Sequence, residues 1–111
     1  MNSPDDVLLV LTNLPDADSA GKLARLLVEQ RLAACVNMLT PCTSVYRWQG
    51  ALETATEQPL LIKTTRARYP ALQAAVHEAH PYELPELIAI PVQEGLPAYL
   101  AWVAAETAPQ P

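Results

Sequence analysis

Apolar positions along this chain follow two different periods, and the changes of period predict its elements. Residues 7–12 form a continuous run of leucine, valine and threonine, which is typical of a strand buried on both faces. Apolar residues then recur at spacings of three and four through residues 20–27, which predicts an amphipathic helix that reaches about Arg31. Three polar residues before it are suited to cap its first turn: Asp16, Asp18 and Ser19.

The middle of the chain predicts strands and a long hairpin. Four strand segments are expected here: residues 35–39, 43–48, 52–56 and 60–65. Pro41 interrupts the first two, because proline within a sheet is confined to edges or bulges. Tyr46 and Trp48 share one face of their strand, and Gln49-Gly50 supplies a turn. A hairpin of this length is expected to project beyond a single sheet.

Prolines mark the elements of the last third. Pro70 suits the first turn of a second helix, which is expected to end near Ala79. Residues 87–92 form the last main strand, and Pro97 opens a short C-terminal helix. The order β-α-β-β-α-β-α predicts an α+β fold whose first six elements match the split βαβ, ferredoxin-like sandwich. Two helices then cover one face of a four-stranded antiparallel sheet, and the extra helix follows.

Length and composition predict one domain that associates with copies of itself. The 111 residues fit a single domain over residues 1–111, with a core of about 7–106 and frayed tails at 1–6 and 107–111. Only 17% of the residues are charged, against about 25% in an average domain. Such a chain has little polar surface, which predicts a buried subunit interface; an unusually alanine- and leucine-rich monomer is the alternative.

Charge and cysteine content exclude several classes of partner. The formal net charge is −5 and no cluster of lysine or arginine occurs, which argues against binding of nucleic acid. No run of about 18 apolar residues occurs, so no membrane partner is expected. Cys35 and Cys42 form no disulfide framework, and the acidic N-terminus lacks the features of a secretory signal. A cytoplasmic location is therefore expected.

The segment His80-Pro81-Tyr82-Glu83-Leu84-Pro85-Glu86 concentrates the chemistry of the chain. It holds an imidazole, a phenol and two carboxylates between a predicted helix and a predicted strand. Its two prolines restrict the backbone, so the segment is expected to be a stiff, extended connector. A rigid connector holds polar groups at fixed positions, which predicts a functional site here.

Four segments together resemble the CutA divalent-cation tolerance proteins: residues 32–37, 44–50, 61–65 and 80–87. They occur in the order and spacing of that family, over about residues 7–104. The resemblance implies a ferredoxin-like fold assembled as a homotrimer, similar in architecture to PII signalling proteins, with a hairpin that reaches a neighbouring subunit. It also implies an association with tolerance of copper and other divalent metals, without an organic cofactor.

His80 is the foremost predicted metal ligand, because neutral imidazole suits copper and zinc. In a copper-binding member the resemblance implies two adjacent histidines before the Pro-Tyr and a cysteine at the end of the first strand. Ala79 and Leu11 stand at those positions here, so any copper or other divalent cation is expected to bind weakly. The alternative is that His80 only ends the helix. Cys35 is a second metal candidate, with a small core residue as its alternative.

The remaining predicted site residues fall into two sets. Expected in an inter-subunit cleft are Trp48, Glu57, Lys63, Tyr82, Glu83 and Glu86, and expected at the trimer interface are Tyr46, Trp48 and Trp102. Lys63 follows three apolar residues and needs a partner if it is buried. It is expected to hold a small anionic ligand, to pair with Glu86, or to join an interface salt bridge.

Two functions other than metal tolerance remain open from the sequence. One is a PII-like sensor of a small anionic molecule, and the other is a structural trimer scaffold. No catalytic residues are predicted, because the chain has no phosphate-binding glycine loop, no credible catalytic triad and no H-E-x-x-H motif. The protein is therefore not expected to be an enzyme.

Overall fold

The computed structural model of the chain describes residues 2–110 and contains eight elements. In chain order they are β1 (Val7–Leu14), α1 (Ala17–Glu29), β2 (Cys35–Met38), β3 (Cys42–Trp48), β4 (Ala51–Thr65), α2 (Tyr69–Ala79), β5 (Leu87–Pro91) and α3 (Pro97–Glu106). The predicted interruption at Pro41 is confirmed, with β2 before it and β3 after it, whereas the predicted segments 52–56 and 60–65 form the single strand β4.

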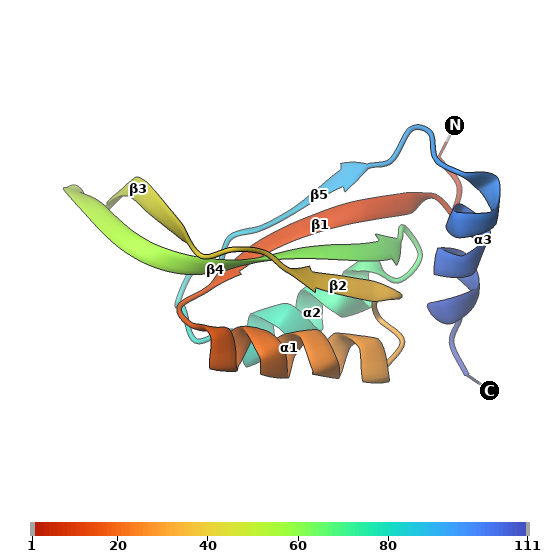
Figure 1. The fold of residues 1–111 in the computed structure, drawn as a ribbon, viewed down its shortest axis with the longest axis horizontal. Helices are drawn as coiled ribbons and strands as arrows, with labels where there is room; N and C mark the ends of the chain where they lie inside the picture. The colour runs from red at the N-terminus through yellow and green to blue at the C-terminus, as the bar shows by residue number, and fades with distance from the viewer. Residues whose placement is uncertain (1, 111) are drawn as a thin grey trace.

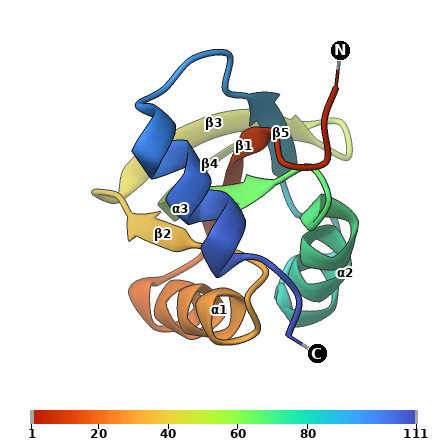
Figure 2. The same ribbon diagram turned by 90° about the vertical axis from the view of Figure 1, so that its right-hand side faces the viewer.

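The strands form an antiparallel sheet in the order β2-β4-β1-β5, with β3 paired to β4 outside this path. Along its length β1 pairs with β4, from Val7 opposite Thr65 to Leu14 opposite Gln58. The helices α1 and α2 lie side by side on one face of the sheet, and α3 lies across one end of it (Figures 1 and 2). The predicted α+β fold with two helices on one face is confirmed, and the sheet has five strands.

Buried and half-buried side chains alternate along the central strands, so the sheet has one face that is closed by the helices and an opposite face that is open. On β1, Leu8, Val10 and Leu14 are buried in one core with residues of β4 and of both covering helices. The core residues from these other elements are Leu23, Leu27, Leu60, Ile62, Leu72 and Val76. The opposite face holds half-buried Leu9 and Leu11 beside β5, whose Ile88 and Ile90 remain 50% and 46% exposed.

A hairpin arm projects from the body of the molecule (Figure 1). We define the arm as β3 together with the first half of β4, paired from Cys42 opposite Glu57 to Trp48 opposite Ala51. Gln49 and Gly50 join its strands with φ values of 50° and 83°, the left-handed pair that a tight hairpin turn requires. The predicted projecting hairpin is confirmed.

Pro59 lies inside β4, although the sequence predicted a break between two strands there. Its carbonyl accepts the N–H of Leu39 at 3.0 Å, on the side of β4 where β2 has already ended at Met38. The N–H and carbonyl of a strand residue point to the same side, so the missing donor costs no bond to β1. The strand therefore runs unbroken through the proline.

Several predicted boundaries are corrected by the structure. The side chain of Asp16 caps α1 by accepting the N–H of Ser19 at 2.8 Å, but the helix ends at Glu29 and Arg31 adopts a φ of 58°. Thr107 was predicted to begin a frayed tail and is instead buried, with its hydroxyl donating to the Val103 carbonyl at 2.8 Å. The tail predictions for Met1 and Pro111 lie outside the described residues.

Backbone bonds also hold the segment before β1. The N–H groups of Arg66 and Ala67 donate to the carbonyls of Asp6 and Pro4 at 2.9 and 3.0 Å. The predicted N-terminal tail is therefore attached to the turn after β4 over these residues. No helix within residues 2–110 is long and apolar enough to cross a membrane.

Candidate functional site

The loop of residues 80–86 leaves the end of α2 and crosses the end of β1 before it enters β5 (Figure 1). The N–H of His80 still donates to the Val76 carbonyl at 2.9 Å, while its backbone is already extended, with φ −77° and ψ 135°. Pro81 explains this change, because a residue before proline is driven away from helical geometry. The helix therefore stops at a fixed point and presents the His80 ring to the sheet.

Both ring nitrogens of His80 are occupied by hydrogen bonds. The N–H of Tyr82 donates to Nδ1 at 3.1 Å, and Nε2 lies 2.7 Å from the Asn13 carbonyl oxygen. Because a backbone N–H can only donate, Nδ1 accepts, and Nε2 must then carry the proton that it donates to Asn13. The residue is only 7% exposed. The ring is thus a neutral link between the loop and β1.

The surroundings of His80 favour its neutral form. Burial lowers the pKa of His80 below its usual 6.5, and the Asn13 carbonyl and the Glu57 carboxylate oppose that effect only in part. A neutral imidazole is the form that accepts the Tyr82 N–H. The charge state and the observed hydrogen bonds therefore agree.

Tyr82 packs beside His80 within the loop. Its ring lies 4.9 Å from that of His80, centroid to centroid. Burial raises the pKa of Tyr82 to about 12, and the negative charge and hydrogen bonding of Glu57 add to the increase. Tyr46 and Asp16 contribute smaller increases. The phenol therefore stays protonated at neutral pH.

The far end of the loop is fixed to β1 by two further bonds. The Thr12 hydroxyl donates to the Glu86 carbonyl at 2.7 Å, and the Asn13 amide donates to the Glu86 carboxylate at 3.3 Å. Glu83, in contrast, is exposed. Thr12 and Asn13 were not among the predicted site residues, although polar side chains at the end of an apolar strand were a usable signal.

Lys63 and Cys35 lie elsewhere, on the open face of the sheet. They are direct cross-strand partners, and the Lys63 Nζ lies 4.0 Å from the Cys35 Sγ. The Lys63 ammonium donates to the Asn37 side chain, whereas Glu86 bonds to Asn13. Among the described residues, the structure therefore does not bring Lys63 and Glu86 together. The predicted pairing across two subunits stays a prediction.

The predicted interface aromatics occupy two separate places. Tyr46 and Trp48 lie on the arm, where they are 43% and 36% exposed. Trp102 lies on α3 beside Tyr99, with ring centroids 5.6 Å apart, and is 42% exposed. Of these rings, Tyr46 belongs to the surroundings of Tyr82. The trimer interface itself stays a prediction.

Possible metal ligands lie dispersed over residues 2–110 of the single chain. No group of three or more histidine, cysteine, aspartate or glutamate side chains within residues 2–110 is arranged to hold a metal ion. A metal ligand must offer a free lone pair, and in His80 one nitrogen accepts the Tyr82 N–H while the other carries a proton. His80 in this conformation therefore does not fit the predicted role as a metal ligand.

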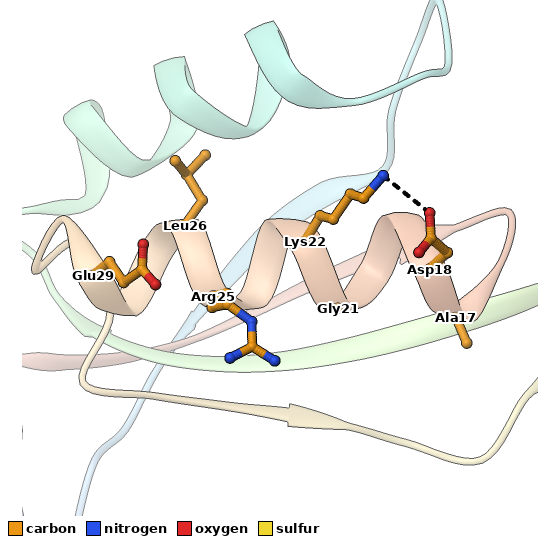
Figure 3. Close-up of a pocket in the computed structure, with 7 residues that line it drawn as sticks. All are labelled: Ala17, Asp18, Gly21, Lys22, Arg25, Leu26 and Glu29. Atoms are coloured by element: carbon orange, nitrogen blue, oxygen red, sulfur yellow. Dashed lines mark ion pairs between the residues drawn. The ribbon is translucent and has the colours of Figure 1, made fainter.

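A surface hollow of about 420 Å³ lies away from this loop, along the outer side of α1 (Figure 3). All of its lining residues belong to α1. The Lys22 ammonium in it pairs with Asp18 at 3.1 Å, and both side chains are well exposed. None of the predicted site residues lines the hollow.

These observations first define a class of protein. A split βαβ sheet is covered by helices on one face, carries a projecting hairpin arm, and is closed by a stiff His-Pro-Tyr loop at the base of that arm. The sequence model described as CutA1 divalent ion tolerance protein matches residues 8–106, and the chain belongs to this family.

Known proteins with related sequences agree with this assignment. The chain is 44% identical over 99 residues to the divalent-cation tolerance protein CutA of Thermus thermophilus, covering 89% of this chain and 96% of that protein. It is 44% identical over 100 residues to the protein CutA of Mus musculus, covering 90% of this chain. The chain spans only 56% of the length of the mouse protein.

A solved structure supports the fold. The crystal structure of CutA from Xylella fastidiosa superimposes with a TM-score of 0.90 at 47% identity, covering 93% of this chain and 99% of that chain. The resemblance drawn from the four sequence segments is therefore confirmed.

Proposed function

We propose that the protein works as a homotrimer in divalent-cation tolerance and binds cations weakly at carboxylates along the seams between its subunits. The open sheet face is the observation that carries this proposal. Leu9 and Leu11 lie there beside Ile88 and Ile90, which are about half exposed in the single chain. Apolar surface of this kind marks a site of association, and three copies arranged around a threefold axis can cover one another's open faces.

The arm supports association in the same way. Val45 and Leu52 are 64% and 72% exposed on it, and Trp48 lies on the other face. A two-stranded ribbon is only marginally stable in water by itself. Contact with a neighbouring subunit would cover its apolar side chains and stabilise it.

The cation contacts in this proposal come from exposed carboxylates rather than from His80. Glu83 in the loop and Glu53 near the tip of the arm are both exposed. Single carboxylates bind divalent cations weakly, and ligands shared between subunits increase the affinity. No catalytic step is proposed. A cytoplasmic location is part of the proposal, because Cys35 and Cys42 are not joined in a disulfide.

Two measurements test this proposal. Sedimentation equilibrium of the 12.1 kDa chain at micromolar concentration should give three times the monomer mass. Calorimetric titration with Zn²⁺ should then show weak binding that Glu53→Gln and Glu83→Gln together reduce, while Glu78→Gln on the exposed side of α2 serves as the matched control. A stable monomer would contradict the assembly, and equal Zn²⁺ binding by all variants would contradict the carboxylate sites.

Lys63 favours a second candidate function, a sensor of a small anionic molecule. Among residues 2–110, no carboxylate forms an ion pair with its ammonium, which lies on the open sheet face beside Asn37. An anion at a subunit seam could supply the missing charge. Thermal-shift screening with nucleotides and organic acids tests this function; stabilisation that is lost in Lys63→Met would support it.

A further inference from the structure

Three polar side chains meet where β2 pairs with β4 on the open face of the sheet. Cys35 and Asn37 alternate along β2 with Val36 between them, so they share one face of the strand. Lys63 is the direct partner of Cys35 on β4, although the two residues are 28 positions apart in the chain. The register of the sheet thus brings a thiol, an amide and an amine together.

The Asn37 amide oxygen holds the other two groups in place. It accepts a hydrogen bond from the Lys63 ammonium, and the Cys35 thiol donates to it over 3.9 Å. The Lys63 Nζ itself lies 4.0 Å from the Cys35 Sγ. Because the lysine side chain is a flexible four-carbon stem, its nitrogen can reach the sulfur without movement of either strand.

Both reactive groups remain available for chemistry. Cys35 is a free thiol, and within residues 2–110 no carboxylate forms an ion pair with Lys63. Both side chains are half-buried, so a molecule as small as hydrogen peroxide can reach the sulfur. A thiol oxidised at this position meets an amine before any larger molecule.

Cys42 provides a comparison within the same chain. It is also a half-buried free thiol. Its cross-strand partner, however, is Glu57, and its sulfur lies 3.8 Å from the Ser44 hydroxyl oxygen. These neighbours offer oxygen atoms rather than an amine nitrogen. Of the two cysteines, Cys35 is therefore the one placed beside a nitrogen nucleophile.

We propose that Cys35 and Lys63 form a redox-sensitive pair, which a hydroperoxide converts into a covalent S–N cross-link between β2 and β4. The thiol sulfur first attacks the peroxide: an S–O bond forms, the O–O bond breaks, and the sulfur loses an electron pair to the oxygen that leaves as water with the thiol proton. The Lys63 ammonium then loses a proton to solvent, and its neutral nitrogen attacks the sulfenic sulfur. The S–N bond forms, the S–O bond breaks, and the hydroxide leaves as water with a further proton from the nitrogen.

The cross-link changes the open face and is reversible. It ties the edge strand β2 to β4 and removes the positive charge of Lys63, which the second candidate function requires. A pair of small thiols reverses it, because they become a disulfide while the Cys35 thiol and the Lys63 amine are restored. The reaction takes place within one chain, so it depends neither on trimer assembly nor on cation binding.

Peptide mapping of the full chain after treatment with hydrogen peroxide tests the cross-link. Trypsin cannot cleave after a modified Lys63, so peptides 32–47 and 48–66 should appear joined, lighter by about 2 Da than the two separate peptides together. Under denaturing conditions the product should keep the 12.1 kDa mass of one chain, and dithiothreitol should separate the peptides again. Absence of the joined peptide, whether Cys35 stays reduced or becomes sulfinic acid, would overturn the proposal, as would a product of two chains.

Conservative substitutions distinguish this pair from general oxidation. Cys35→Ser and Lys63→Arg should each lower the yield of the joined peptide at least about tenfold; the arginine keeps the positive charge but stays protonated and does not attack sulfur. Cys42→Ser is the matched control and should give the wild-type yield. Equal yields from Cys35→Ser and Cys42→Ser would overturn the assignment to Cys35.

The fate of the sulfur in Lys63→Arg gives a second readout. Without an amine to intercept the sulfenic acid, Cys35 should proceed to sulfinic acid, heavier by about 32 Da, whereas wild type should be protected. Asn37→Leu removes the shared oxygen and should lower the yield of the joined peptide about threefold. Equal sulfinic acid in wild type and Lys63→Arg would overturn the role of Lys63, and an unchanged yield in Asn37→Leu would overturn the positioning role of Asn37.

Discussion

The two halves of β4 differ sharply in what surrounds them. Residues 58–65 lie beside β1, and alternate side chains of this half enter the core. Residues 51–57 pair only with β3, and most of them are exposed. Apolar residues of the first group are explained by contacts within one chain. Those of the second group, such as Leu52, have no such explanation within the described residues, which makes them the part of the sequence suited to another subunit.

Leu60→Ala should produce the largest effect, because Leu60 is fully buried in the body half of β4. Loss of its side chain removes apolar burial and leaves a cavity, so the free energy of unfolding should fall by about 2–5 kcal/mol. Urea denaturation monitored by circular dichroism measures this change. A loss below about 1 kcal/mol would show that the two halves of β4 differ less than the structure indicates.

Trp48→Arg tests the arm half through assembly. It places a charge where a desolvated contact is expected, so the trimer should dissociate at a concentration at least about tenfold higher. Analytical ultracentrifugation over a range of concentrations measures the effect. Gln73→Arg, on the exposed side of α2, adds the same charge outside the arm and is the control that should leave the mass unchanged. An intact Trp48→Arg trimer at low micromolar concentration would refute this placement of Trp48.

Gly50→Ala should lower the free energy of unfolding by about 1 kcal/mol, because Gly50 adopts a φ of 83° in the arm turn and an alanine is strained in that conformation. Gly21 provides the opposite case within α1, where an added Cβ meets no atom within 4 Å. Gly21→Ala should therefore stabilise the chain by about 0.5–1 kcal/mol. Thermal unfolding of both variants measures these changes in stability relative to wild type. Equal shifts in the same direction would contradict the assigned turn geometry.

The pH dependence at His80 should be the smallest effect. Burial lowers the pKa of His80 in the folded state, so the unfolded chain takes up a proton first as the pH falls through 6.5. The free energy of unfolding should therefore fall between neutral pH and the lowered pKa, and become flat below it. Urea denaturation at pH 7.5 and 5.5 measures this slope. His80→Gln should lose the His80 contribution, and an unchanged slope would contradict the assignment.

Much of the fold could be predicted because local signals agreed with one another. The switch from strand to helical period located β1 and α1, and Gln49-Gly50 marked the turn of the arm. The predicted break between residues 56 and 60 was wrong, because Pro59 would end the strand only if its missing N–H were needed there. Whether a donor is needed at Pro59 depends on where β2 ends, and that is decided by the pairing of strands distant in sequence.

The site was predicted less completely for a related reason. The composition of residues 80–86 drew attention to a loop in which His80 bonds to the Asn13 carbonyl and its ring packs beside that of Tyr82. The engagement of both His80 nitrogens depends on the Asn13 carbonyl, a main-chain atom 67 positions earlier in the chain. A list of side-chain types cannot reveal such a partner. For the same reason the sequence could not show whether Lys63 and Glu86 lie close together, because their separation depends on the register of the sheet.

The two-residue turn at Gln49-Gly50 also restricts how the arm can change length during evolution. A turn of this type closes a hydrogen-bonded pair, and such pairs alternate with non-bonded ones along an antiparallel ribbon. Insertions or deletions that keep the turn must therefore add or remove two pairs together, four residues in all, or about 7 Å of reach. Homologous arms should thus fall into discrete length classes, while the body of the molecule stays the same.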